Sequence, residues 1–500
     1  MRCMPPTSTR CATESPAGGE WGGGSGGVLR CIIPGAGESG LTQCKHTLQR
    51  ERTGERPIPR APRRTRLSRE MLLWASIALL AAVSGAQAQC LGGKSAMTKT
   101  NRLDPQALPN AQRAFSAEML RHLGRRDEND TGLGSNLFFS PYSTYMALLL
   151  AYFGSASTTE EVLQKGLHLG QIEKGRVMEA YKMERFFQGT RAGKSDPTNY
   201  ELSSANRLYF REQQELKECV SEFFKDEIQK LNFQSNPDEA RSEINAWVAG
   251  QTKNRITDLL PSGAITPLTN VVLVNAGYFK GLWQSQFQPE NTRKAVFYMS
   301  STESALVDMM RQKGSFNHAV SQSLGAHLLE LPYKGNEVSM VILLPPYLNQ
   351  PDGGLQHLLA RLTPEALQEA MEPGSMSARQ VEVAIPKFSI DHSLELVPVL
   401  EKLGLGAVFQ VDADLSGFSD DKNATIHLDG AVHKARLEVD EKGSVAAAAT
   451  ALFSFRSSRP LEPEQFVCDH PFVYLIVDKL GGGTILFAGI YRNPRELQQN

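Results

Sequence analysis

The chain has 500 residues and a formal net charge of −1, from 53 lysines and arginines against 54 aspartates and glutamates. A chain of this length with 41% hydrophobic residues can bury a large core, which excludes a small scaffold that depends on disulfides. The charge is unevenly divided, because the first 70 residues carry a net +6 and the rest of the chain carries −7.

Residues 1–70 differ from the rest of the chain in composition. They hold 11 of the 42 glycines, 7 of the 27 prolines and 4 of the 7 cysteines. A Gly/Ser tract such as residues 22–27 cannot bury enough apolar surface to order itself. The basic run at residues 60–69 would suit a nucleic-acid patch. We interpret residues 1–70 instead as a disordered leader or mis-annotated upstream translation, and we expect no nucleic-acid partner.

A secretory signal peptide is predicted for residues 71–88. Met71 opens an apolar run of about 12 residues, which is too short to span a bilayer, since a span needs about 20. The sequence Ala86-Gln87-Ala88 follows, in the A-x-A pattern of a cleavage site. We therefore expect a secreted, extracellular protein without a membrane span. Its mature chain would begin near Gln89, with residues 89–110 as an N-terminal segment.

The cysteines and the sequons of the mature chain fit an extracellular protein with a large core. Three cysteines would remain, Cys90, Cys219 and Cys468. An odd number argues against a disulfide framework and leaves at least one unpaired thiol or an intermolecular bond. Two N-glycosylation sequons, at Asn129 and Asn423, predict surface positions in a glycoprotein.

Helical periodicity dominates the first half of the mature chain, and strand patterns dominate the second. The predicted helices are residues 111–123, 142–153, 158–167, 172–188, 216–231, 240–252, 355–371 and 394–403, with a break expected near Pro364. The predicted strands are residues 136–141, 202–210, 270–279, 326–333, 338–344, 381–388, 435–439, 466–477 and 484–491. Because helices and strands are segregated, we predict one mixed α+β domain with large sheets, followed by a short tail at residues 495–500.

The predicted helix at residues 172–188 mixes basic and acidic side chains. Its cations are Lys174, Arg176, Lys182 and Arg185. Such a face could bind a polyanion such as heparin, but a solvated helix face explains the same pattern, and we favour it.

The chain lacks the common sequence motifs of catalysis and metal binding. It contains no H-E-x-x-H, no P-loop, no credible G-x-G-x-x-G and no paired C-x-x-C. The ten histidines have no Cys or His partners at metal-ligand spacing. We therefore expect no metal, no cofactor and no enzymatic activity.

The stretch at residues 441–459 is unusual for a loop. Gly443 precedes a run of small residues, an apolar segment and then basic residues among serines. The alanine run is compatible with a helix, since alanine has the highest helix propensity. As an extended strand the stretch would present one face of small side chains with no proline to interrupt a ladder. That face would carry Ser444, Ala446, Ala448 and Thr450.

Several separated stretches resemble motifs of the serpins, the serine protease inhibitor family. Asn136, Ser140, Pro141 and Ser143 are similar to the family's N-x-x-x-S-P-x-S opening. Other similar stretches are residues 245–248 with Thr252, 275–283, 432–435, 439–443, 469–472 and 487–489. The resemblance covers residues 111–494 and implies an α+β serpin fold, with three β-sheets, about nine helices and an exposed C-terminal reactive loop.

The resemblance also implies which residues act. A protease would cleave the reactive loop, and the freed loop would insert into the main sheet as a new central strand. The reactive-loop hinge would comprise Glu441, Gly443, Ser444, Val445, Ala446, Ala447, Ala448, Ala449 and Thr450. The residues matching the region where the sheet opens are Ser140, Ser143, Asn275, Trp283 and His433. Ordinary buried polar groups, and for Trp283 an ordinary core aromatic, explain the same residue types.

The residue before the cleaved bond sets which protease is caught. We assign the reactive bond to Arg456–Ser457, because a trypsin-like specificity pocket holds a carboxylate that pairs with arginine. The family's usual loop length, counted from Gly443, reaches Ser457 instead and would give Ser457–Ser458. Phe455 would suit a chymotrypsin-like target.

The expected partner is an extracellular trypsin-like serine protease, held in a covalent complex by a monomeric inhibitor. The alternative is a non-inhibitory serpin that acts as a carrier or chaperone. The small hinge residues argue against that alternative.

Overall fold

The structure is a computed structural model that describes residues 104–125, 134–194, 199–348, 354–421, 426–442 and 463–498. The chain divides into two units, Met1–Ser68 and Arg69–Asn500, and every described residue belongs to the second. Several predicted features lie outside the described residues: the leader, the signal peptide, Asn129, Asn423, the hinge residues 443–450, Arg456 and Ser457.

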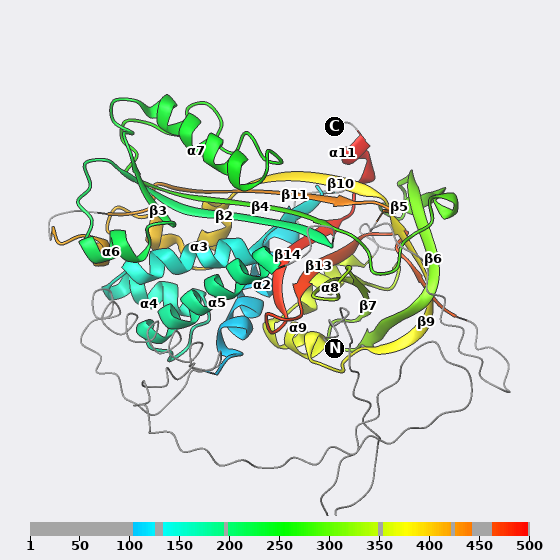
Figure 1. Cartoon of the computed structure of the whole chain (residues 1–500). Helices are drawn as coiled ribbons and strands as arrows, with labels where there is room; N and C mark the ends of the chain where they lie inside the picture. Colours follow the sequence, from blue (N-terminus) through cyan, green and yellow to red (C-terminus); the bar gives the residue numbers. More distant parts are fainter. Residues whose placement is uncertain are drawn as a thin grey trace, which may run out of the picture. The chain divides into compact units, whose positions relative to one another are not determined.

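One sheet has five strands in the order β10-β11-β4-β2-β3 (Figure 1). Its strands are β2 (Tyr200–Arg211), β3 (Ile228–Leu231), β4 (Val271–Gly281), β10 (Phe388–Glu395) and β11 (Gly430–Val439). β11 is antiparallel to β10 but parallel to β4, and β4 is antiparallel to β2. The centre of this sheet is therefore a parallel junction between β4 and β11.

β4 is buried along most of its length because other elements cover both of its faces. Val272, Val274 and Ala276 point into a small core shared with α7 (Pro237–Gln251). The intervening Leu273 and Phe279 belong to the main core on the opposite face. Figure 1 shows α7 and α3 (Pro141–Gly154) on opposite sides of this sheet. A strand covered in this way reads as a nearly continuous apolar run, which is the pattern predicted for residues 270–279.

The second sheet has nine strands and follows the order β1-β14-β13-β8-β7-β6-β9-β12, with β5 paired to β6. Its strands are β1 (Leu137–Phe139), β5 (Arg293–Tyr298), β6 (Ser304–Ser321), β7 (Ala326–Pro332), β8 (Val338–Leu344), β9 (Ser377–Pro386), β12 (Glu464–Val467), β13 (Phe472–Asp478) and β14 (Thr484–Tyr491). The 18-residue β6 pairs with β5 near its start and with β7 near its end. Three separate sheets were expected. Because the single long strand β6 has partners at both of its ends, two of those sheets are hydrogen-bonded into one.

Ten α-helices lie within the described residues. Besides α3 and α7 they are α2 (Ala107–Gly124), α4 (Ser157–Gly166), α5 (Lys174–Lys194), α6 (Glu218–Phe223), α8 (Leu355–Arg361), α9 (Pro364–Met371), α10 (Leu396–Lys402) and α11 (Pro494–Gln498). α3 is buried on every side, which explains why its sequence is apolar without a helical period. Segregated helices around two large sheets confirm the predicted mixed α+β class.

The described cysteines are Cys219, which is disulfide-bonded, and Cys468, which is free and fully buried. Cys468 is thus an unpaired thiol of the kind that the odd cysteine count predicted. None of the described helices is long and apolar enough to cross a membrane.

Candidate functional site

The junction between β4 and β11 joins two parallel strands of the five-stranded sheet. The two strands pair in register from Val272 opposite Gly430 to Phe279 opposite Leu437. The chain leaves β11 at Val439 and enters residues 443–462, the reactive loop expected from the sequence. A segment that turned back from here into the junction would run antiparallel to both neighbours, because those neighbours are parallel to each other. Antiparallel ladders are slightly more stable per residue than parallel ones.

A row of polar side chains crosses this junction. Asn206 on β2, Asn275 on β4 and His433 on β11 lie directly opposite one another in the strand register. The His433 ring Nδ1 hydrogen-bonds Asn275 Oδ1, and Asn275 Nδ2 donates to Asn206 Oδ1 at 2.7 Å. The row therefore ties three adjacent strands together by side chains as well as by backbone.

Residues at the N-terminus of α3, which packs on one face of the sheet, belong to the same hydrogen-bond network. The Ser140 backbone N–H donates to His433 Nε2 at 2.9 Å, and Ser140 Oγ caps α3 by accepting from the Ser143 N–H at 3.0 Å. Ser143 Oγ accepts from Asn275 Nδ2 at 2.9 Å. Opening the junction would break the bond between His433 and Asn275, and these contacts oppose that opening.

His433 is neutral in this setting. Its side chain is fully buried, and burial, with a smaller contribution from His392, lowers its pKa to about 3. Since Nε2 accepts from a backbone N–H, the ring proton resides on Nδ1 and is donated to Asn275. A neutral ring can therefore satisfy both bonds without an unpaired buried charge.

The structure brings together four of the five predicted sheet-opening residues: Ser140, Ser143, Asn275 and His433. Trp283 lies instead where the chain leaves β11, and its indole Nε1 donates to the Asp440 carbonyl at 2.9 Å. Its ring stacks on Tyr333 with centroids 4.5 Å apart. Asn206 was not predicted, although a lone asparagine on the core-facing side of a predicted strand was a usable signal.

Glu441 fixes the start of the expected hinge. Its carboxylate accepts from Thr292 Oγ1 at 3.0 Å and pairs with Lys387 Nζ at 2.8 Å, and its side chain is only 10% exposed. Burial raises the pKa of Glu441, but the bonds from Lys387, the backbone and Thr292 outweigh burial, so the net pKa lies below its ordinary value. The structure thus holds an ionised carboxylate two residues after the end of β11.

The cations of α5 are engaged with their own neighbours. Lys174 pairs with Glu160 at 2.8 Å and Arg185 with Glu227 at 3.1 Å. Lys182 sits over the Phe223 ring. Lys174 is only 8% exposed and therefore departs from the solvated face predicted for this helix, whereas Arg185 is 40% exposed. In the part of the chain that the structure describes, no group of three or more His, Cys, Asp or Glu side chains could hold a metal.

Comparisons with known proteins agree with this arrangement. The family described as Serpin (serine protease inhibitor) matches residues 110–494. The chain is 40% identical over 408 residues to Serine protease inhibitor 88Ea of Drosophila melanogaster, which covers 78% of this chain and 92% of that protein. It is 37% identical over 365 residues to the leukocyte elastase inhibitor of Bos taurus, covering 72% and 93% respectively. The crystal structure of uncleaved ovalbumin superposes with a TM-score of 0.65 at 27% identity, covering 77% of this chain and all of that one.

Proposed function

The chain belongs to the serpin family, and we propose that it is a secreted suicide-substrate inhibitor of an extracellular trypsin-like serine protease. Its similarity to relatives named as protease inhibitors supports inhibition over enzymatic activity.

In the proposed reaction the protease attacks the peptide carbonyl of Arg456. The serine oxygen of the protease forms an ester with that carbonyl, the bond to the nitrogen of Ser457 breaks, and the leaving amine takes a proton. The freed loop then inserts between β4 and β11. About 13 residues at roughly 3.3 Å each form a strand of about 43 Å, so the tethered protease is carried most of a protein diameter before water can hydrolyse the ester.

The observation that carries the proposal is the point at which the chain leaves the sheet. The chain enters residues 443–462 directly from β11, one of the two strands that flank the parallel junction. The alternating small residues Ser444, Ala446, Ala448 and Thr450 suit a strand whose one face must be buried. No bulky or charged side chain among these four would oppose burial.

The proposal is tested by incubating the chain from Gln89 onward with trypsin and reading the products on denaturing gels and by intact mass. We expect a covalent complex that survives denaturation, together with a released peptide that begins at Ser457. A released peptide that begins at Ser458 or Arg456 would be consistent with the same mechanism, but would show that a different bond is cleaved and that the target specificity differs. Clean cleavage without any complex would contradict inhibition and favour the carrier or chaperone alternative.

A further inference from the structure

An ion pair spans the junction between β4 and β11 on the face opposite the polar row. Lys280 on β4 and Glu438 on β11 directly follow the last two paired residues of the register. Lys280 Nζ donates to Glu438 Oε2 and lies 4.0 Å from Asp440 Oδ2. Because successive side chains of a strand alternate, the pair lies on the α7 side of the sheet, whereas the polar row lies on the core side. Each face of the junction therefore carries its own side-chain contact between the two strands.

Both side chains of this ion pair are largely shielded from water. The side chain of Lys280 is 32% exposed and that of Glu438 is 21% exposed. The hydrogen bond from Lys280 lowers the pKa of Glu438 by more than burial raises it, so the carboxylate is ionised at neutral pH. A partly shielded ion pair attracts more strongly than one in bulk water, and dissolved salt weakens that attraction. The contact between the two strands therefore depends on ionic strength.

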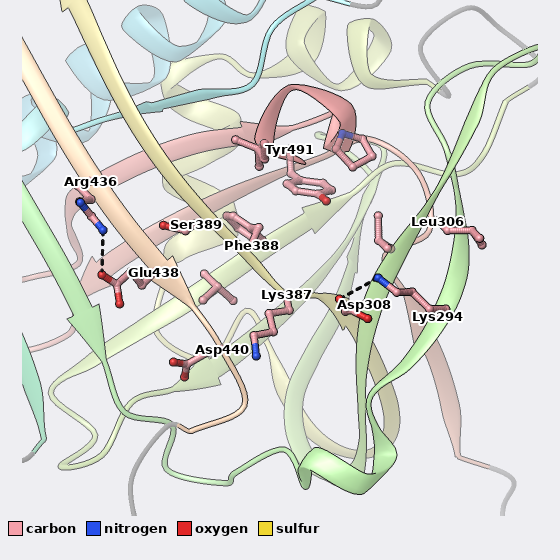
Figure 2. A pocket seen from close by; sticks show the side chains of 14 residues that line it. Lys294, Leu306, Asp308, Lys387, Phe388, Ser389, Arg436, Glu438, Asp440 and Tyr491 are labelled. Atoms are coloured by element: carbon pink, nitrogen blue, oxygen red, sulfur yellow. Dashed lines mark hydrogen bonds and ion pairs between the residues drawn. The ribbon is translucent and has the colours of Figure 1, made fainter. Parts of the chain in front are cut away.

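Opening the junction would separate Lys280 from Glu438, but each would keep an opposite charge on its own side. Glu438 also pairs with Arg436 Nη2 at 3.5 Å, and both residues belong to β11, as Figure 2 shows. Lys280 lies opposite Glu201 of β2 in the strand register. Glu201 in turn pairs with Lys253 at 2.9 Å. The loss on opening is therefore that of one ion pair, which is small enough for the junction to open and close reversibly.

We infer that Lys280 and Glu438 form an ionic latch, which keeps the junction between β4 and β11 closed and sets how often it opens. The two residues are positioning residues, because they act through the strands that flank the junction. Salt screens the ion pair, so the junction opens more often at higher ionic strength. The assignment of this junction as the site of loop insertion rests on the proposed function, but the latch acts in the uncleaved chain.

The test measures amide hydrogen exchange by mass spectrometry in the full, uncleaved chain at pH 7 and low salt. Backbone amides that pair β4 with β11 exchange when the junction opens, so their exchange rate reports how often it opens. Lys280→Met removes the charge and keeps a long side chain. We expect these amides to exchange about two- to fivefold faster in this variant. Sodium chloride at about 0.5 M should speed exchange by a similar factor in the unmodified chain and by much less in Lys280→Met.

Two control variants separate the latch from a general effect of losing a lysine. Lys294→Met removes a lysine whose ion pair with Asp308, at 3.0 Å, joins β5 to β6 in the other sheet, as Figure 2 shows. This variant should leave exchange in β4 and β11 unchanged. Lys280→Arg keeps a positive charge opposite Glu438, so it should exchange as slowly as the unmodified chain and respond to salt in the same way.

The inference is overturned if the amides of β4 and β11 exchange no faster in Lys280→Met than in the unmodified chain. It is also overturned if Lys280→Arg exchanges as fast as Lys280→Met, or if salt speeds exchange equally in Lys280→Met and in the unmodified chain. The experiment contains no protease, so its failure is distinct from a failure of inhibition. Clean cleavage by trypsin without a complex would contradict the proposed function and leave the exchange result standing.

Discussion

At Glu441 a carboxylate that is almost fully buried depends on a lysine that is about half exposed. Lys387→Met should leave that carboxylate without its cation. Since an unsatisfied buried charge costs about 1–3 kcal/mol or more, the free energy of unfolding should fall by about that amount. Denaturant unfolding at pH 7 measures the difference between the variant and the unmodified chain.

Lys294→Met is the matched control for this prediction. Lys294 also pairs with a carboxylate, but its partner Asp308 is 48% exposed, so water can replace the lysine. We expect a change of less than about 1 kcal/mol for the control. Equal losses in the two variants would show that burial of Glu441 does not matter.

His433 makes stability depend on pH. Its pKa is about 3 in the folded chain against an ordinary value of 6.5, so between these values the unfolded chain binds a proton that the folded chain does not. The contribution of neutral His433 to the free energy of unfolding is therefore fully present above about pH 6.5. It is lost as the pH falls below that value, by up to about 1.4 kcal/mol per pH unit.

The free energy of unfolding should differ between pH 7 and pH 5, and part of that difference comes from His433. His433→Gln should remove this part. By the same slope, this part is about 2 kcal/mol. His357→Gln, at an exposed position on α8, should leave the difference unchanged. If the unmodified chain, His433→Gln and His357→Gln all show the same pH dependence of stability, the neutral, buried state of His433 is contradicted.

At the scale of elements, the account requires one face of the loop strand to enter the sheet. Ala446→Arg would place a charge on that face, and the cost of burying it should prevent insertion. The variant should therefore be cleaved as a substrate, with complex formation reduced at least tenfold. Gels that compare complex with cleaved chain measure this partition.

Ala447→Arg carries the same charge on the opposite face of the strand, since successive side chains of a strand alternate. This variant should still form the complex. If Ala446→Arg inhibits as well as Ala447→Arg does, the proposed register of insertion is wrong.

Elements whose residues face a single environment could be predicted from the sequence. The strand predicted at 484–491 matches β14, and the strand at 270–279 nearly matches β4. β6 was missed, because it alternates between exposed and buried positions without a consistent apolar face.

Breaks inside predicted helices were only partly anticipated: one was expected near Pro364, and none was expected in residues 216–231. Residues 216–231, predicted as one helix, form α6 and then β3. Residues 355–371 form two helices, since Thr363 caps α9 with Pro364 in its first turn.

The candidate site was predictable in part. Ser140, Ser143, Asn275 and His433 were identified through the family resemblance, and the structure shows them hydrogen-bonded together. Thr292 and Lys387, which hold Glu441, were not predicted. Each lies far from Glu441 in sequence, and only the tertiary fold brings these polar side chains together.

For the whole molecule, the account predicts that cleavage within residues 443–462 stabilises the protein. The inserted strand replaces one parallel ladder with two antiparallel ladders. Roughly a dozen new backbone hydrogen bonds at about 1 kcal/mol each imply a gain on the order of 10 kcal/mol. Thermal unfolding should show a much higher Tm for the cleaved chain, and cleaved Ala446→Arg should lack that increase.

The most direct test of the central claim is a crystal structure of the cleaved chain. The account predicts a sixth strand, made of residues that begin near Ser444, between β4 and β11 and antiparallel to both. The bond between His433 and Asn275 should then be broken. A cleaved chain in which Val272 still pairs with Gly430 and Phe279 with Leu437, as they do before cleavage, would contradict the account.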